Sequence, residues 1–257
     1  MSLAISQPGK TEAVIIIKAA PQVGTRSGET VCCAAIDIYG KWHRLYPVSF
    51  RHLDDGQKFG RWDRVEFRWR TPKDDPRIES RRIDQHSLKI IGQIKESERS
   101  GFLAKSIVTS LENERKQGRS LALLKAHVTD FRIEPKTDSD ILEQKAKFDS
   151  LRAQPDLLNT KPLIPYSPCP YKFKYRYRTD DGIREGTCQD WEIEATFFKW
   201  SKQYGENAAL EMMKQRFGEE YPRKGMLLAM GTHSQYPDTW LINGIIRFDD
   251  TRQLSLL

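Results

Sequence analysis

Residues 171–178 combine two kinds of side chain in a pattern suited to binding a polyanion. Their sequence, Tyr-Lys-Phe-Lys-Tyr-Arg-Tyr-Arg, alternates aromatic and cationic residues. Alternate side chains of a β-strand point to opposite faces, so the aromatic residues share one face and the cations share the other. The four cations of this face are Lys172, Lys174, Arg176 and Arg178.

A row of cations on one strand face can contact phosphates. Neighbouring cations of the row lie roughly 7 Å apart, which suits the phosphate spacing of a single nucleic-acid strand. The same alternation is typical of a half-buried strand that keeps its aromatic residues in the core and its cations in water. Both interpretations predict a buried aromatic face. Only the first gives the cationic face a function, and we expect that face to bind nucleic acid.

Residues 64–70 repeat this pattern in a weaker form. Val65, Phe67 and Trp69 share one face, and Glu66 lies among the arginines of the other. The acidic side chain lowers the charge of that face, and most charged residues nearby are typical of an ordinary solvated surface. The further candidate phosphate contacts are Arg64, Arg68, Arg70 and, in the preceding strand, Arg44.

Three other residues carry side chains that can hold a divalent cation for phosphodiester hydrolysis. Asp190 and Glu192 lie close in sequence, and His233 lies in a later loop, so the three could bind Mg²⁺ or Mn²⁺ in a nuclease. A structural interpretation competes, because Thr187 and Asp190 match a capping box that opens a helix. Residues two apart on a helix also face different directions, which disfavours joint chelation by Asp190 and Glu192.

The sequence indicates no other cofactor or metal site. Cys169 and Cys188 lack the Cys-x-x-Cys partners of a zinc site. The glycine-rich phosphate loops of ATP- and NAD-binding proteins are absent as well. We therefore expect no cofactor, apart from the Mg²⁺ or Mn²⁺ that the nuclease alternative would need.

Composition places the chain among water-soluble globular proteins. Of its 257 residues 38% are hydrophobic and 30% are charged, and the net charge is +7. A positive balance of this size is compatible with a polyanionic partner. The few cysteines and the lack of a leader pattern or long apolar run predict a cytoplasmic protein without a membrane segment.

The spacing of the expected elements predicts an α+β fold. Short strands joined by short turns favour an antiparallel β-meander or small barrel in a β-rich part, residues 1–134, which also holds a helix at 101–118 and a strand at 123–133. Residues 135–170 form a helical and proline-rich connector. Residues 171–257 form a strand-helix-helix-strand-strand part, with helices at 189–204 and 206–217 and later strands at 226–232 and 240–248.

The favoured hypothesis is a cytoplasmic protein that binds DNA or RNA through its cationic strand faces. One alternative is a metal-dependent nuclease, or another enzyme acting on nucleic acid, built on Asp190, Glu192 and His233. A second alternative is a protein-interaction module whose cationic face docks an acidic partner. The type of nucleic acid, its sequence and the oligomeric state are not predicted.

Overall fold

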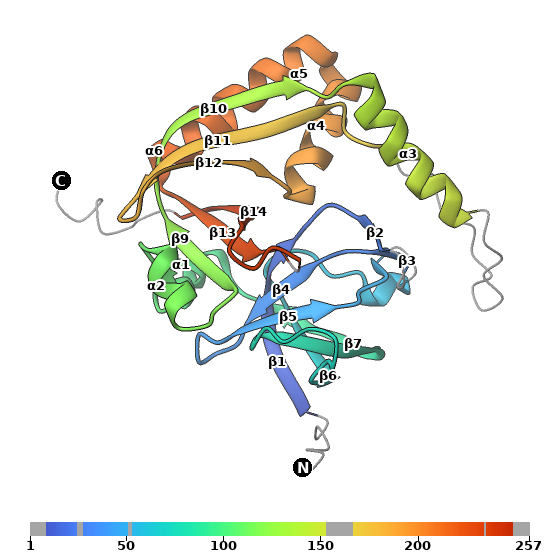
Figure 1. Cartoon of the computed structure of the whole chain (residues 1–257), viewed down its shortest axis with the longest axis vertical. Helices are drawn as coiled ribbons and strands as arrows, with labels where there is room; N and C mark the ends of the chain where they lie inside the picture. Colours follow the sequence, from blue (N-terminus) through green and yellow to red (C-terminus); the bar gives the residue numbers. More distant parts are fainter. Residues whose placement is uncertain (1–8, 25–27, 51–52, 153–166, 234, 249–257) are drawn as a thin grey trace.

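The computed structural model describes residues 9–24, 28–50, 53–152, 167–233 and 235–248. Within these ranges the chain forms two β-units that pack against each other, and the second unit carries most of the helices (Figure 1). The predicted α+β fold is confirmed. Every helix in the described ranges is too short or too polar to span a lipid bilayer.

The first unit is a closed five-stranded barrel. Its strands are β1 (Gly9–Lys18), β4 (Cys33–Ile36), β5 (Trp42–Tyr46), β6 (Asp63–Arg70) and β7 (Ser80–Gln93). They close in the order β1-β4-β5-β7-β6, and all neighbours are antiparallel except β5 and β7. This is the strand order of the OB-fold, in which the third strand runs parallel to the fifth. The predicted N-terminal barrel is confirmed.

Alternating residues fill the interior of this barrel. Ile15 of β1, Leu45 of β5, and Val65 and Phe67 of β6 are all fully buried there. Two short strands, β2 (Gln22–Gly24) and β3 (Gly28–Thr30), form a separate hairpin between β1 and β4.

The second unit is a seven-stranded sheet. Its strands are β8 (Ile107–Val108), β9 (Leu121–Lys125), β10 (His127–Pro135), β11 (Tyr171–Thr179), β12 (Gly182–Cys188), β13 (Met226–Thr232) and β14 (Trp240–Arg247). They lie in the order β10-β11-β12-β14-β13-β9-β8. Strands β8, β9 and all but the last residue of β10 therefore lie within residues 1–134, the predicted N-terminal part, although they belong to the second sheet.

The second unit repeats the strand order of the first. The strand predicted at 123–133 is broken at Ala126, so that β9 pairs with β13 and β10 pairs with β11. Strands β12 and β14 run parallel and meet at Cys188 and Ile242. If β9 and β10 count as two halves of one strand, the order is again that of an OB-fold.

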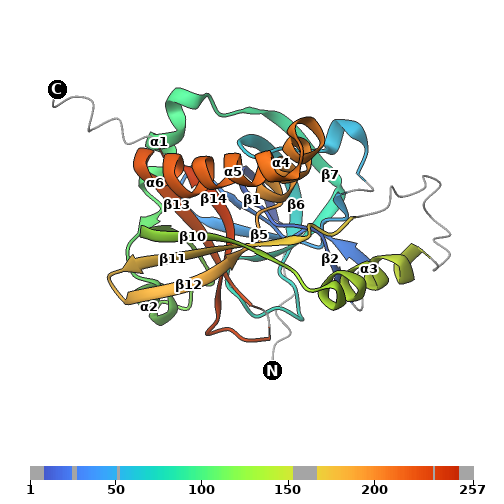
Figure 2. The ribbon, with the colours of Figure 1, turned by 90° about the horizontal axis from the view of Figure 1, so that it is seen from above.

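The helices follow the predictions in part. The predicted helices at 189–204 and 206–217 correspond to α4 (Trp191–Tyr204) and α5 (Glu206–Met213), and the second continues as the π-helical segment η3 (Lys214–Glu220) and α6 (Tyr221–Lys224). These helices run along one side of β10, β11 and β12 (Figure 2). The connector holds α3 (Asp138–Arg152), and its residues 153–166 lie outside the described ranges.

The single helix predicted at 101–118 is wrong. The chain forms α1 (Glu96–Ala104), then β8, then α2 (Leu111–Lys116). The β-branched residues Ile107, Val108 and Thr109 favour an extended chain between the helices. Ser110 then begins α2 as its N-cap and accepts a hydrogen bond from the Asn113 amide.

The two units share an apolar interface. The outward faces of β1, β4 and β5 pack against β9, β13 and β14, so both sheets are buried on this side. The interface includes Val14, Ile16, Ala34, Ile36 and Trp42 from the barrel and Leu121, Leu123, Leu227, Ala229 and Ile246 from the second sheet. As a result, the outward face of the barrel's second and third strands is covered.

Candidate nucleic-acid interface

Strand β11 has one buried face and one solvent-facing side. Phe173, Tyr175 and Tyr177 are each at most 2% exposed and pack beneath the helices, as the alternation predicts. The Tyr175 hydroxyl donates a hydrogen bond to the Phe217 carbonyl oxygen at 3.2 Å. Burial raises the pKa of Tyr175 well above its usual value, so this phenol stays neutral. The aromatic face therefore has a structural role.

The two lysines of the cationic face are engaged by acidic residues. Lys172 Nζ lies 2.9 Å from Asp140 Oδ2 of α3, and Lys174 Nζ lies 2.7 Å from Glu134 Oε2 of β10. The hydrogen bond from each lysine holds the pKa of its carboxyl partner below the ordinary value. Their charges are thus balanced within the protein.

Arg132, on the neighbouring strand β10, occupies the other carboxylates of this face. Its guanidinium lies 3.0 Å from Asp130, 3.8 Å from Glu134 and within hydrogen-bonding distance of Glu185 on β12. Asp130 and Glu185 are the two residues directly opposite Arg176 in the strand register. Because Arg132 binds both, neither forms an ion pair with Arg176.

Arg176 and Arg178 are the exposed cations at the hairpin end of β11. Neither forms an ion pair with another residue in the described ranges. Arg178 lies opposite His127 on β10 and Ile183 on β12, and all three are exposed. The predicted row of four cations thus contains two charges balanced by the protein and two available to a ligand.

Arg44 lies away from this surface. Its side chain is buried, and Nη2 donates to the Ser120 carbonyl oxygen at 2.9 Å and to the Ser120 hydroxyl at 3.1 Å. Glu79 accepts hydrogen bonds from the amide and the hydroxyl of the same serine. The structure therefore gives Arg44 the role of joining the two β-units, and a phosphate cannot reach it there.

The remaining arginine candidates lie on the outer face of β6. Arg64 is 3.5 Å from Glu12, whereas Arg68 and Arg70 are exposed and lack an ion pair within the described part of the chain. Strand β6 lies at the opposite end of the molecule from β11, with β4, β5, β13 and β14 between them (Figure 1). The structure does not bring the two cationic strands together into one groove.

Asp190 is a helix cap and an ion-pair partner. It is fully buried, and its Oδ1 accepts a hydrogen bond from the Glu192 amide at the start of α4. Its Oδ2 accepts from Arg61 Nη2 at 2.6 Å and from the Ile245 amide at 2.9 Å. The helix start expected at residues 187–192 is present, but Asp190, and not Thr187, is its N-cap.

The structure separates His233 from the two carboxylates. The His233 amide bonds to Thr239, just before β14, whereas Asp190 bonds to Ile245 within β14. Six residues of extended chain separate these two points, a length of roughly 20 Å. No group of three or more His, Cys, Asp or Glu residues in the described ranges is placed to hold a metal ion. Asp190, Glu192 and His233 do not form one site.

The ion-pair partners of the cationic face were not identified from the sequence. Asp130, Arg132 and Glu134 alternate with Phe131 and Ile133, which is the same half-buried pattern as that of β11. Two neighbouring strands with this pattern place opposite charges side by side. The alternation on β10 was therefore the signal that could have predicted the pairing.

Two family models match the chain, and both are described as domains of unknown function. DUF8758 matches residues 9–106, and DUF8757 matches residues 104–256. Their border coincides with the start of β8, where the second sheet begins. No curated protein matches the sequence.

Solved structures show weak likeness to this chain. One is described as the Ifi202 HINa domain in complex with 20bp dsDNA, with 8% identity, a TM-score of 0.30, and coverage of 72% of this chain and 76% of that chain. Another is a replication protein A heterotrimer bound to ssDNA, with 11% identity, a TM-score of 0.24, and coverage of 98% and 68%. Likeness at this level does not extend to function.

Proposed function

We propose that this chain, which belongs to the DUF8757 family of domains of unknown function, binds nucleic acid at the hairpin end of β11. The observation that carries the proposal is the pair of exposed guanidinium groups of Arg176 and Arg178. Both lack an acidic partner within the described residues, on a face whose other cations are ion-paired.

The chemistry of these two side chains suits phosphate. A guanidinium is always charged at neutral pH and can donate two parallel hydrogen bonds to a phosphate. Arg176 and Arg178 are two residues apart on one strand face, so their stems lie roughly 7 Å apart. Two adjacent phosphates of one strand could each contact one arginine.

The strand order gives a second, weaker support. In barrels of the OB-fold type, the outward face of the second and third strands is a common surface for oligonucleotides. In the first barrel this face belongs to β4 and β5 and is covered by the second sheet. In the second unit it belongs to β11 and β12, where the side chains of Arg176, Arg178 and Glu185 are exposed. This support is an analogy at the level of fold.

Two double variants with equal changes in charge test the proposal. Arg176→Gln with Arg178→Gln removes the two unpaired cations, and Lys172→Gln with Lys174→Gln removes the two paired ones. We expect the arginine variant to weaken binding of a labelled oligonucleotide by about tenfold or more, and the lysine variant to weaken it much less. Equal losses would show that affinity follows net charge alone, and unchanged affinity in the arginine variant would reject this binding site.

A further inference from the structure

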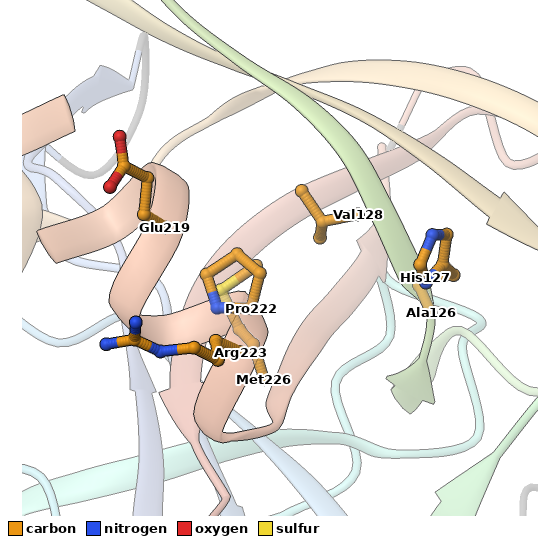
Figure 3. A pocket seen from close by; sticks show the side chains of 7 residues that line it. All are labelled: Ala126, His127, Val128, Glu219, Pro222, Arg223 and Met226. Atoms are coloured by element: carbon orange, nitrogen blue, oxygen red, sulfur yellow. The ribbon is translucent and has the colours of Figure 1, made fainter. Parts of the chain in front are cut away.

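A pocket of about 310 Å³ lies where β9 and β10 separate (Figure 3). Three consecutive residues, Ala126, His127 and Val128, line one side of it, and η3 and α6 line the other. His127 and Val128 extend from opposite sides of β10 (Figure 3). Since both faces of the strand contribute, the pocket opens at the free edge of β10.

The pocket has an apolar floor and a polar rim. The floor consists of Ala126, Val128, Pro222 and Met226. The rim consists of His127, Glu219 and Arg223. Within the described ranges, none of these three rim side chains forms an ion pair or a side-chain hydrogen bond. They present one acceptor, one set of donors and one imidazole that are free to bind a ligand.

The helical side of the pocket is formed by an uncommon conformation. Glu219 belongs to the π-helical segment η3, and such segments are rare and frequent at functional sites. Gly218, in the same segment, packs directly on Phe131 of β10, where an added Cβ would lie 3.0 Å from the ring. The absence of a side chain at Gly218 therefore lets η3 approach the edge of β10.

One residue of the pocket, His127, is the register neighbour of a cation of β11. His127 lines the pocket and lies directly opposite Arg178 in the register of β10 and β11. Adjacent strands lie roughly 4.8 Å apart. A phosphate bound by Arg178 would therefore be within one nucleotide of the pocket mouth.

We propose that this pocket receives one unpaired base of a single-stranded nucleic acid whose phosphates contact Arg176 and Arg178. The inference rests on the proposed function and adds the class of ligand. The flat faces of a base would contact the apolar floor at Val128 and Pro222. The charged ends of Glu219 and Arg223 point away from Val128 and His127 (Figure 3), so these exposed side chains would turn toward the base, the carboxylate to accept from its polar edge and the guanidinium to donate to it. A paired base in a duplex must first leave its stack, so a single strand binds better.

The test compares three ligands of the same length, of which the single strand and the abasic oligomer carry the same number of phosphates and the duplex carries twice as many. They are a single strand of about 12 nucleotides, the duplex of the same sequence, and an abasic oligomer of the same length. Fluorescence anisotropy with the full chain gives each dissociation constant. We expect the single strand to bind about tenfold more tightly than the abasic oligomer, in the range measured for one bound base, and more tightly than the duplex.

Variants of the pocket should remove the preference for the single strand over the abasic oligomer. Ala126→Leu fills the floor, and Arg223→Ala removes an exposed donor at the rim with little risk to the fold. Both should bring the single strand to the affinity of the abasic oligomer. Lys224→Ala is the matched control, because it removes the same charge from the next residue of α6, which does not line the pocket. It should lower the affinity for both ligands equally and leave the preference intact.

The outcomes separate the two proposals. If the wild type binds the single strand and the abasic oligomer equally, the base pocket is rejected while phosphate binding stands. The same conclusion follows if Arg223→Ala and Lys224→Ala behave alike. If neither ligand binds, the proposed function fails, and the pocket proposal fails with it.

Discussion

Arg61 and Asp190 form a buried ion pair that joins the barrel to the first turn of α4. Arg61 Nη2 lies 2.6 Å from Asp190 Oδ2, and Arg61 Nη1 also donates to the Ile245 carbonyl oxygen. Their side chains are 10% and 1% exposed. Although burial opposes it, the Asp190 carboxylate raises the pKa of Arg61, so the guanidinium remains charged.

Breaking this pair should destabilise the fold. Asp190→Asn leaves the Arg61 charge buried without its counter-charge, and the loss of unfolding free energy should be about 3–5 kcal/mol. Urea denaturation followed by circular dichroism measures it. Glu192→Gln, at a residue that lies 3.5 Å from Arg61 and is 44% exposed, is the control and should cost much less. A stable Asp190→Asn protein would contradict the structural role of Asp190.

The Arg44, Ser120 and Glu79 cluster should also contribute stability and not affinity. Ser120→Ala removes a hydroxyl that donates to Glu79 and accepts from Arg44. Because it leaves both buried charges with one partner fewer, we expect a loss of about 1–3 kcal/mol. Ser150→Ala, in an exposed position on α3, is the control and should be near neutral. Oligonucleotide affinity should be unchanged in both variants.

A change at Tyr175 should likewise lower the stability of the fold without altering oligonucleotide affinity. Tyr175→Phe removes the hydrogen bond to the Phe217 carbonyl oxygen and should cost about 1 kcal/mol of unfolding free energy. Tyr177→Phe is the control, because the Tyr177 hydroxyl forms no side-chain hydrogen bond within the described ranges. Neither change should alter oligonucleotide affinity. A loss of affinity in Tyr175→Phe without loss of stability would mean that the aromatic face is part of the binding site.

His43 should make stability depend on pH. Burial lowers the pKa of His43 from 6.5, although the hydrogen bond from Nε2 to Asp37 opposes the shift. The unfolded chain therefore binds a proton that the folded protein excludes. Stability is complete above about pH 6.5 and falls with decreasing pH, by up to roughly 1.4 kcal/mol per pH unit, until the pKa of the folded state is passed.

Urea midpoints measured between about pH 5 and pH 7.5 test this dependence, because the window brackets the ordinary histidine pKa. In the His43→Gln variant the urea midpoint should fall less steeply as the pH decreases. His86→Gln is the control, since His86 is exposed on β7. If the wild type and His43→Gln gave parallel profiles, the slope would have another source.

The alternation of the strands predicted much of the fold and half of the candidate site. Local patterns placed β6, β11, β13 and β14 within a residue or two, because a period of two depends only on neighbouring residues. The second OB-like order was not predicted. It depends on the break at Ala126 and on one parallel contact between Cys188 and Ile242, which are 54 residues apart in the sequence numbering.

The ion pairs of the site also depend on residues that are distant in the sequence. The buried aromatic face of β11 follows from local alternation. Whether a cation has a partner within the protein depends on such distant residues. Lys172 bonds to Asp140, 32 residues away in the sequence, and Arg44 bonds to Ser120, 76 residues away. Within the described ranges, a row of four cations in sequence therefore becomes two cations with an acidic partner and two without one.

The salt dependence of oligonucleotide binding tests the central claim most directly. Each phosphate contact with a single strand contributes about −0.7 to the slope of log K against log salt concentration. With Arg176 and Arg178 as the two cations of the β11 face that lack an ion pair within the described ranges, the predicted slope is about −1.4, and it should fall close to zero when both are replaced by glutamine. Binding that is insensitive to salt, or a slope that stays the same in the double arginine variant, would contradict the claim.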